Sequence, residues 1–166
     1  GQNHVMALKQ DGTLWSWGYN LHGNLGDGTT TYRSSPIQVG ALTTWAYIGA
    51  LSRTSFAVNT SGQLFSWGTG SAGVLGSGAS TNRSSPVQVG ALTTWASVSS
   101  AASDVTHAVK TDGTLWGWGA VNLGEIGNGD SSLPHYSSPV QIGAATDWIP
   151  FVQQRGHMGA ALRTPA

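Results

Sequence analysis

Cysteine is absent from the 166 residues, which excludes disulfide bonds, thiolate metal sites and cysteine nucleophiles. Charge is scarce too, because seven lysines and arginines balance seven aspartates and glutamates, and together they make up 8% of the chain. An average soluble domain carries about 25%. Nucleic-acid binding relies on clustered Lys and Arg that neutralise phosphates. The sequence has no such cluster, so we expect no nucleic-acid partner.

Long apolar runs are also missing. No stretch approaches the roughly 18 apolar residues of a membrane-spanning helix, so we expect no membrane insertion. Helical periodicity is not sustained in any window, and the 24 glycines recur too often for long helices. The chain starts at Gly1 rather than Met, a start typical of a processed chain or of part of a longer protein.

The sequence does contain a repeated hairpin signature. A turn glycine is followed by Leu, an aromatic residue, Trp and a second Gly in residues 11–18, 61–68 and 112–119. The turn glycines Gly12, Gly62 and Gly113 are 50 and 51 residues apart. A period of this length, built on short strands between glycines, predicts a propeller or another repeat array.

Each unit is predicted to hold four short strands. In the first unit, residues 1–9 and 13–17 alternate in the way that predicts a hairpin around Gly12. Residues 36–40 predict a third strand, with Pro36 at its first position where no ladder hydrogen bond is lost, and residues 45–50 predict the fourth. The whole chain, 1–166, is thus an all-β segment with units 1–50, 51–101, 102–154 and a partial fourth unit 155–166.

Four motifs of the first unit carry a family resemblance. They are His-x-x-Ala-Leu, Asp-Gly-x-Leu-Trp-x-Trp-Gly, Gly-x-Leu-Gly-x-Gly and Ser-Pro-x-x-Val, at residues 4–8, 11–18, 23–28 and 35–39. The pattern resembles the repeat of the regulator of chromosome condensation family. The resemblance implies a β-propeller segment of four-stranded antiparallel blades, with three repeats plus one extra strand. It also implies that more sequence, copies of this chain or other protein chains complete the ring.

Motifs for catalysis or for cofactor binding are not supported. Residues 68–73 spell Gly-x-Gly-x-x-Gly, but no helix can start there to hold a pyrophosphate. The five histidines show no metal-ligand spacing, and no nucleophile elbow, P-loop or His-Glu-x-x-His motif occurs. We therefore expect no cofactor, no metal, no catalytic residue and no enzymatic activity. A carbohydrate-active hydrolase stays open as an alternative, since two carboxylates distant in sequence can converge.

Tryptophans recur at fixed places in the units. Their periodic placement predicts structural packing within and between blades. They are Trp15, Trp17, Trp45, Trp67, Trp95, Trp116, Trp118 and Trp148.

Other aromatic residues do not repeat, and these, with Arg33 beside Tyr32, are better candidates for binding because loops are free of packing constraints. The third unit also carries a two-residue insertion in the loop before Tyr136. The predicted contact residues are Tyr19, Tyr32, Arg33, His135 and Tyr136.

The prediction for function is a non-enzymatic binding module. The family resemblance and the polar, weakly charged sequence point to an extracellular setting, on a bacterial surface protein or on a phage virion or tail appendage. There the variable loops would recognise a host glycan or protein, as in adhesion. The alternative is a purely structural component of a larger assembly.

Overall fold

The computed structural model describes residues 1, 3–102, 104–130 and 132–151. These residues form eleven strands and one short 3₁₀ turn, Ser71–Gly73, labelled η1. The described residues include no helix that is long and apolar enough to cross a membrane.

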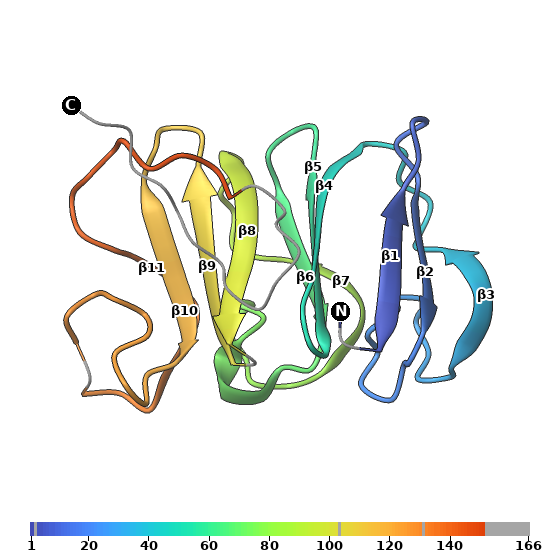
Figure 1. Ribbon diagram of the computed structural model, residues 1–166, viewed down its shortest axis with the longest axis horizontal. Coiled ribbons are helices and arrows are strands. Elements are labelled where there is room, and N and C mark those ends of the chain that lie inside the picture. Colours follow the sequence, from blue (N-terminus) through green and yellow to red (C-terminus); the bar gives the residue numbers. More distant parts are fainter. Residues whose placement is uncertain (2, 103, 131, 152–166) are drawn as a thin grey trace.

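The strands form three antiparallel sheets that lie side by side (Figure 1). The first sheet contains β1 (His4–Leu8), β2 (Leu14–Gly18) and β3 (Arg33–Gln38). The second contains β4 (Trp45–Ala50), β5 (Thr54–Asn59), β6 (Leu64–Gly68) and β7 (Arg83–Gln88). The third contains β8 (Trp95–Ala102), β9 (Val105–Lys110), β10 (Leu115–Ala120) and β11 (His135–Gln141).

Strands that follow one another in the chain are neighbours in each sheet. The central hairpins close through Gly12, Gly62 and Gly113, whose φ angles of 77°, 74° and 77° suit glycine. The all-β fold predicted from the sequence is confirmed, with two antiparallel four-stranded sheets and one three-stranded sheet.

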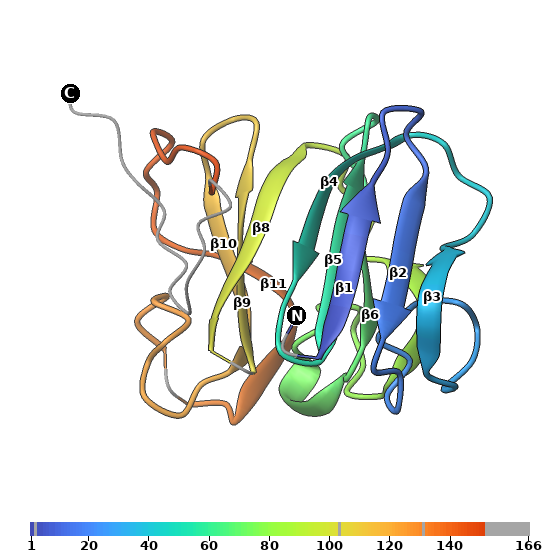
Figure 2. The same cartoon turned by 45° about the vertical axis from the view of Figure 1, so that its right-hand side comes forward.

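The sheets are offset from the sequence units. β4 is the last strand of the first unit, yet it pairs with β5 in the second sheet. β8 likewise leaves the second unit and pairs with β9. The first and second units therefore each contribute one strand to the next sheet, which links neighbouring sheets through the chain itself. β1 also packs beside β4 across the boundary between the first two sheets (Figure 2). The extra strand expected in 155–166 lies outside the described residues.

The prediction that Pro36 opens its strand is wrong. β3 begins at Arg33, which pairs with Gly18, and the next pair is Ile37 with Ser16. Pro36 lies between these pairs, in an irregularity of the ladder on a strand at the edge of its sheet. Edge strands and bulges tolerate proline because no ladder hydrogen bond is required of its nitrogen there.

The core lies between the sheets. One cluster joins the first two sheets through Leu14, Val39, Trp45, Ala57 and Trp67. A second joins the second and third sheets, with Phe56, Val58, Leu64, Val89, Trp95, Val98, Ala108 and Trp118.

The tryptophans divide into two groups. Trp45, Trp67, Trp95 and Trp118 are buried. Trp15, Trp17, Trp116 and Trp148 are partly exposed.

Candidate functional site

Three long loops lie on one edge of the molecule. They connect β2 to β3, β6 to β7 and β10 to β11, and all three emerge at the lower edge in Figure 1. We call residues 19–33, 69–83, 121–130 and 132–136 the loop edge. All five predicted contact residues belong to it. The hairpin turns around Gly12, Gly62 and Gly113 lie at the opposite edge (Figure 1).

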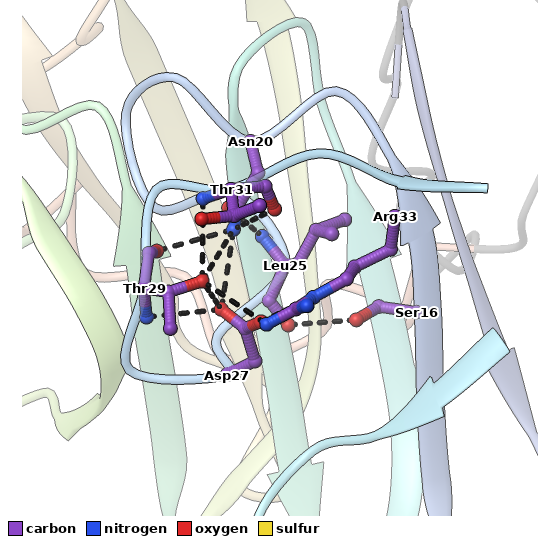
Figure 3. Close-up of polar contacts among 7 residues, drawn as sticks. All are labelled: Ser16, Asn20, Leu25, Asp27, Thr29, Thr31 and Arg33. Carbon is purple, nitrogen blue, oxygen red and sulfur yellow. Dashed lines mark hydrogen bonds and ion pairs between the residues drawn. The ribbon is translucent and has the colours of Figure 1, made fainter. Parts of the chain in front are cut away.

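The first loop is held by the buried side chain of Asn20 (Figure 3). Its Nδ2 donates to the carbonyl oxygens of Thr29 and Thr31, at 3.1 and 3.0 Å, and to Asp27 Oδ1 at 3.1 Å. Its Oδ1 accepts from the backbone N–H of Leu25 at 2.9 Å. One amide thus joins both ends of the loop, so the residues displayed on it are held in fixed positions.

Asp27 and Arg33 form an ion pair inside this loop (Figure 3). Arg33 donates from Nε and Nη2 to Asp27 Oδ2, at 2.9 and 2.7 Å. Burial acts to raise the pKa of Asp27, but hydrogen bonds from Thr29 and Arg33 outweigh it and hold the pKa below its ordinary value. The guanidinium predicted as a contact group is therefore partly committed to the loop itself.

An aromatic cluster stands beside this ion pair. The rings of Tyr19 and Tyr32 stack with centroids 5.2 Å apart and an interplanar angle of 29°. The His22 ring lies 6.0 Å from Tyr19. Tyr32 is 57% exposed, so it presents a ring to solvent while Tyr19 supports it. His22 was missed in the sequence, although its equivalents Ala72 and Leu123 mark it as non-repeating.

The third loop places His135 and Tyr136 at the other end of the loop edge. The Tyr136 hydroxyl donates to Asp130, which raises the pKa of Tyr136 and lowers that of Asp130 to about 2. His135 Nε2 lies 3.3 Å from Ser80 Oγ of the second loop. The five predicted contact residues therefore fall into two groups, with the second loop between them.

The first loop also attaches the second sheet. The carbonyl oxygen of Asn24 accepts from Trp67 Nε1 at 2.9 Å and from Ser55 Oγ at 2.8 Å. Gly26 lies directly against the Trp67 ring, and a Cβ there would come within 2.7 Å of Nε1. The loop edge is thus fixed to the sheets by buried hydrogen bonds.

The second loop repeats this arrangement on the third sheet. The carbonyl oxygen of Val74 accepts from Trp118 Nε1 at 2.8 Å and from Thr106 Oγ1 at 3.0 Å. These acceptors could not be found from the sequence, because Asn24 and Val74 share no side-chain chemistry and use only their backbone.

His4 extends the contact between the first two sheets. Its Nε2 lies 2.9 Å from Ser55 Oγ. Ser55 already donates its hydrogen to Asn24, so Nε2 must carry the ring hydrogen. Nδ1 is buried with no hydrogen-bond partner among the described residues. Burial lowers the pKa of His4 to about 4, and the positive amino group of Gly1 adds to this effect.

The loop carboxylates serve the loops themselves. Asp27 is bonded by Arg33, and Asp130 by Tyr136. Within the described ranges, no group of three His, Cys, Asp or Glu residues is arranged to hold a metal ion. The chemistry that this edge offers is aromatic stacking and hydrogen bonding on a rigid support.

Comparisons with known proteins agree with this architecture. The family model of the regulator of chromosome condensation (RCC1) repeat matches residues 11–58 and 61–108. Human WBSCR16 has a similar structure, with a TM-score of 0.74, 20% identity, and coverage of 86% of this chain and 38% of that one. Prp20p of Saccharomyces cerevisiae gives a TM-score of 0.76, 22% identity, and coverage of 89% and 38%.

A third structure is yeast RCC1 (Prp20) bound to Kap60, with a TM-score of 0.73, 19% identity, and coverage of 92% of this chain and 37% of that one. The chain spans less than two fifths of the length of these proteins. At such identities the likeness shows the fold, which is that of a β-propeller segment.

Proposed function

The chain belongs to the regulator of chromosome condensation (RCC1) repeat family, and from that premise we propose that it is a non-enzymatic β-propeller segment that binds a protein partner through its loop edge. The observation that carries the proposal is Tyr32, exposed and stacked on Tyr19 above a loop held by Asn20. Among structural relatives, Prp20p is described with binding properties to Gsp1p and histones, and yeast RCC1 (Prp20) is bound to Kap60.

The physical argument rests on rigidity. Tyrosine offers a large amphipathic contact area and loses little conformational entropy on binding. A loop that is ordered before binding avoids part of the entropic cost of association. The amide of Asn20 and the ion pair of Asp27 with Arg33 order this loop without a ligand. Tyr19 and Tyr32 are therefore suited to act as an anchor, with His135 and Tyr136 as a second contact group.

The proposed setting is outside the cell, on a bacterial surface protein or on a phage virion or tail appendage. The support is the near absence of charge, with Lys, Arg, Asp and Glu at 8% of the residues. The partner would then be a host protein or a host glycan. An exposed tyrosine ring is favourable for stacking on a sugar, which makes the glycan the second candidate.

Completion of the propeller is a separate part of the proposal. Trp17 is partly exposed and Val5 is 44% exposed, while the equivalent Trp67 and Trp118 are buried under the preceding loop. We propose that another blade covers this face, supplied by other protein chains, by a copy of this chain or by more of the same chain. If no separate ligand exists, this assembly role is the function.

Affinity capture with matched variants tests the binding proposal. The chain, its Tyr32→Ala variant and its Leu42→Ala variant are immobilised and exposed to the same extracellular protein mixture and to a glycan array. Leu42 is 45% exposed and lies on the connection between β3 and β4. The next residue on this connection, Thr43, has its carbonyl oxygen against Gly12, so Leu42 is at the edge opposite the loop edge. The proposal expects a protein that is lost with Tyr32→Ala and kept with Leu42→Ala. Glycan signals with this pattern would favour the second candidate, and equal capture by all three would contradict both.

A further inference from the structure

The three units carry a hydrogen-bond donor at one equivalent position of the loop edge. Arg33, Arg83 and Tyr136 each pair with an equivalent glycine of the preceding strand of their sheet, Gly18, Gly68 and Gly119 respectively. Arg33 donates to Asp27 of its own loop, and Tyr136 donates to Asp130 of its own loop. In both cases the donor at this position has an acidic partner.

The second loop keeps the donor but not the acid. Counting from the glycine that ends the strand, the residue equivalent to Asp27 is Ser77, and the residue equivalent to Thr29 is Ala79. Arg83 is exposed. The described residues contain one salt bridge, that of Arg33 with Asp27, so Arg83 has no acidic partner among them.

Around Gly78 the backbone of the second loop follows that of the first loop around Gly28. Gly28 and Gly78 have φ angles of 80° and 82°. Each donates its N–H at 2.8 Å to a carbonyl oxygen of the next sheet, that of Ser84 and that of Ser137 respectively. The residue before each glycine is therefore held in the same place. Ser77 occupies the position of Asp27 with a shorter side chain.

Ser77 itself lacks a partner. Its Oγ is buried and has no hydrogen bond to any described residue. Burying a hydroxyl without a partner is unfavourable, and Ser77 stands at the position from which the Asp27 carboxylate accepts from Arg33 in the first loop. The missing carboxylate and the unpaired hydroxyl are separate observations that indicate the same place.

We propose that Arg83 is a binding site for a carboxylate, and that its occupant is an aspartate side chain of the protein partner. This rests on the proposed function and names the chemistry of the partner. The occupant would take the place that Asp27 has beside Arg33, where the guanidinium donates twice, at 2.9 and 2.7 Å, to one oxygen. Charge-assisted pairs with arginine add geometric specificity as well as energy.

A protein carboxylate is favoured over an acidic sugar by the occupant seen in the first loop, which is an aspartate presented on a turn between two glycines. The site also adjoins the aromatic cluster. Asn82 precedes Arg83, and its Nδ2 lies 3.5 Å from Nδ1 of His22, whose ring lies 6.0 Å from that of Tyr19. One partner could therefore contact the aromatic cluster and place an acidic side chain on Arg83.

NMR of the arginine Nε–H groups tests the site directly. The probe is the peptide acetyl-Gly-Asp-Gly-Thr-amide, the sequence of residues 26–29, and its control is the same peptide with Asn in place of Asp. We expect a saturable chemical-shift change of the Arg83 Nε–H signal with the Asp peptide and none with the Asn peptide. The Kd should be on the order of 10 mM, since an exposed ion pair contributes little free energy.

Three variants complete the test. Arg83→Gln should weaken binding at least fivefold, while Arg53→Gln, which removes another exposed arginine, should leave it unchanged. Ser77→Asp supplies the carboxylate from within the chain and should also weaken peptide binding at least fivefold.

Unchanged binding with Ser77→Asp or with Arg83→Gln would overturn the site. A shift of Arg83 with glucuronate but not with the peptide would overturn the aspartate in favour of an acidic glycan. These outcomes do not depend on Tyr32, so failure here is distinguishable from failure of the capture experiment.

Discussion

Single residues in this protein often act through their backbone. The carbonyl of Asn24 receives two donors from the second sheet, and Gly26 matters because it has no side chain. Gly26 combines a φ of 75° with direct contact to the Trp67 ring. Gly40 has a φ of 63°, and no atom lies within 4 Å of the place that a Cβ would take there. The two glycines therefore separate the cost of backbone conformation from the cost of crowding.

We predict that Gly40→Ala lowers the free energy of unfolding by about 1 kcal/mol, the cost of a positive φ for an L-residue. Gly26→Ala should lower it by roughly 2–4 kcal/mol, because overpacking against Trp67 adds about 1–3 kcal/mol. Urea denaturation of the two variants beside the unchanged chain measures both values. Equal losses would mean that the loop moves away from Trp67 at little cost.

His4 predicts a dependence of stability on pH. Burial lowers its pKa from 6.5 to about 4, so between these values the unfolded chain binds a proton that the folded protein does not. The contribution of His4 to the free energy of unfolding is fully present above pH 6.5 and is lost as pH falls toward 4. The loss amounts to about 3 kcal/mol.

The control for this prediction is His4→Gln, whose amide can still donate to Ser55. Denaturation at pH 7 and at pH 4 gives the change in the free energy of unfolding between these pH values for each chain. The change should be about 3 kcal/mol smaller in the variant, and an equal change in both chains would show that His4 does not titrate in this range.

At the scale of elements, the second and third sheets each depend on the loop before them. The indoles of Trp67 and Trp118 donate to carbonyls of the preceding loop and are buried. Trp17 has the same place in β2 but is partly exposed. Identical positions in the repeat therefore differ in burial according to what covers them.

Trp67→Ala should cost about 3–5 kcal/mol, the usual range for a buried tryptophan. Trp17→Ala should cost less than half as much, because part of its ring is in solvent. Denaturant melts of the two variants give the comparison. A loss of similar size in both would show that Trp17 is packed in solution by a neighbour.

Much of this arrangement could be predicted from the sequence, because hairpins depend on local signals. Alternating strands around Gly12, Gly62 and Gly113 place β1, β2, β5, β6, β9 and β10. The assignment of β4 and β8 to the following sheet could not be predicted, since it depends on pairing between residues of different units. The start of β3 at Arg33 was missed for a similar reason, because the pairing of Arg33 with Gly18 spans an irregular ladder.

The candidate site divides in the same way. Tyr19 and Tyr32 were predicted as contact residues because they differ between units, and Arg33 because it adjoins Tyr32. The structure places all three around one loop. The ion pair of Arg33 with Asp27 was not anticipated, since its two residues are common loop residues when each is taken alone. The unpaired Arg83 becomes visible only when the three loops are compared with their partners in place.

For the whole molecule, the staggered sheets and the inter-sheet hydrogen bonds give one rigid support for the loop edge. Three loops emerge on the same side (Figure 1), and side-chain hydrogen bonds link the first to the second and the second to the third. A partner that binds this edge would meet residues of all three loops. Binding there should also leave the hairpin turns of the opposite edge unaffected.

Hydrogen–deuterium exchange of the chain with and without a partner captured as described above tests this account most directly. The account predicts new protection in residues 19–33, 69–83, 121–130 and 132–136, with unchanged exchange in the turns around Gly12, Gly62 and Gly113. Protection confined to those turns, with the loop edge unchanged, would contradict it.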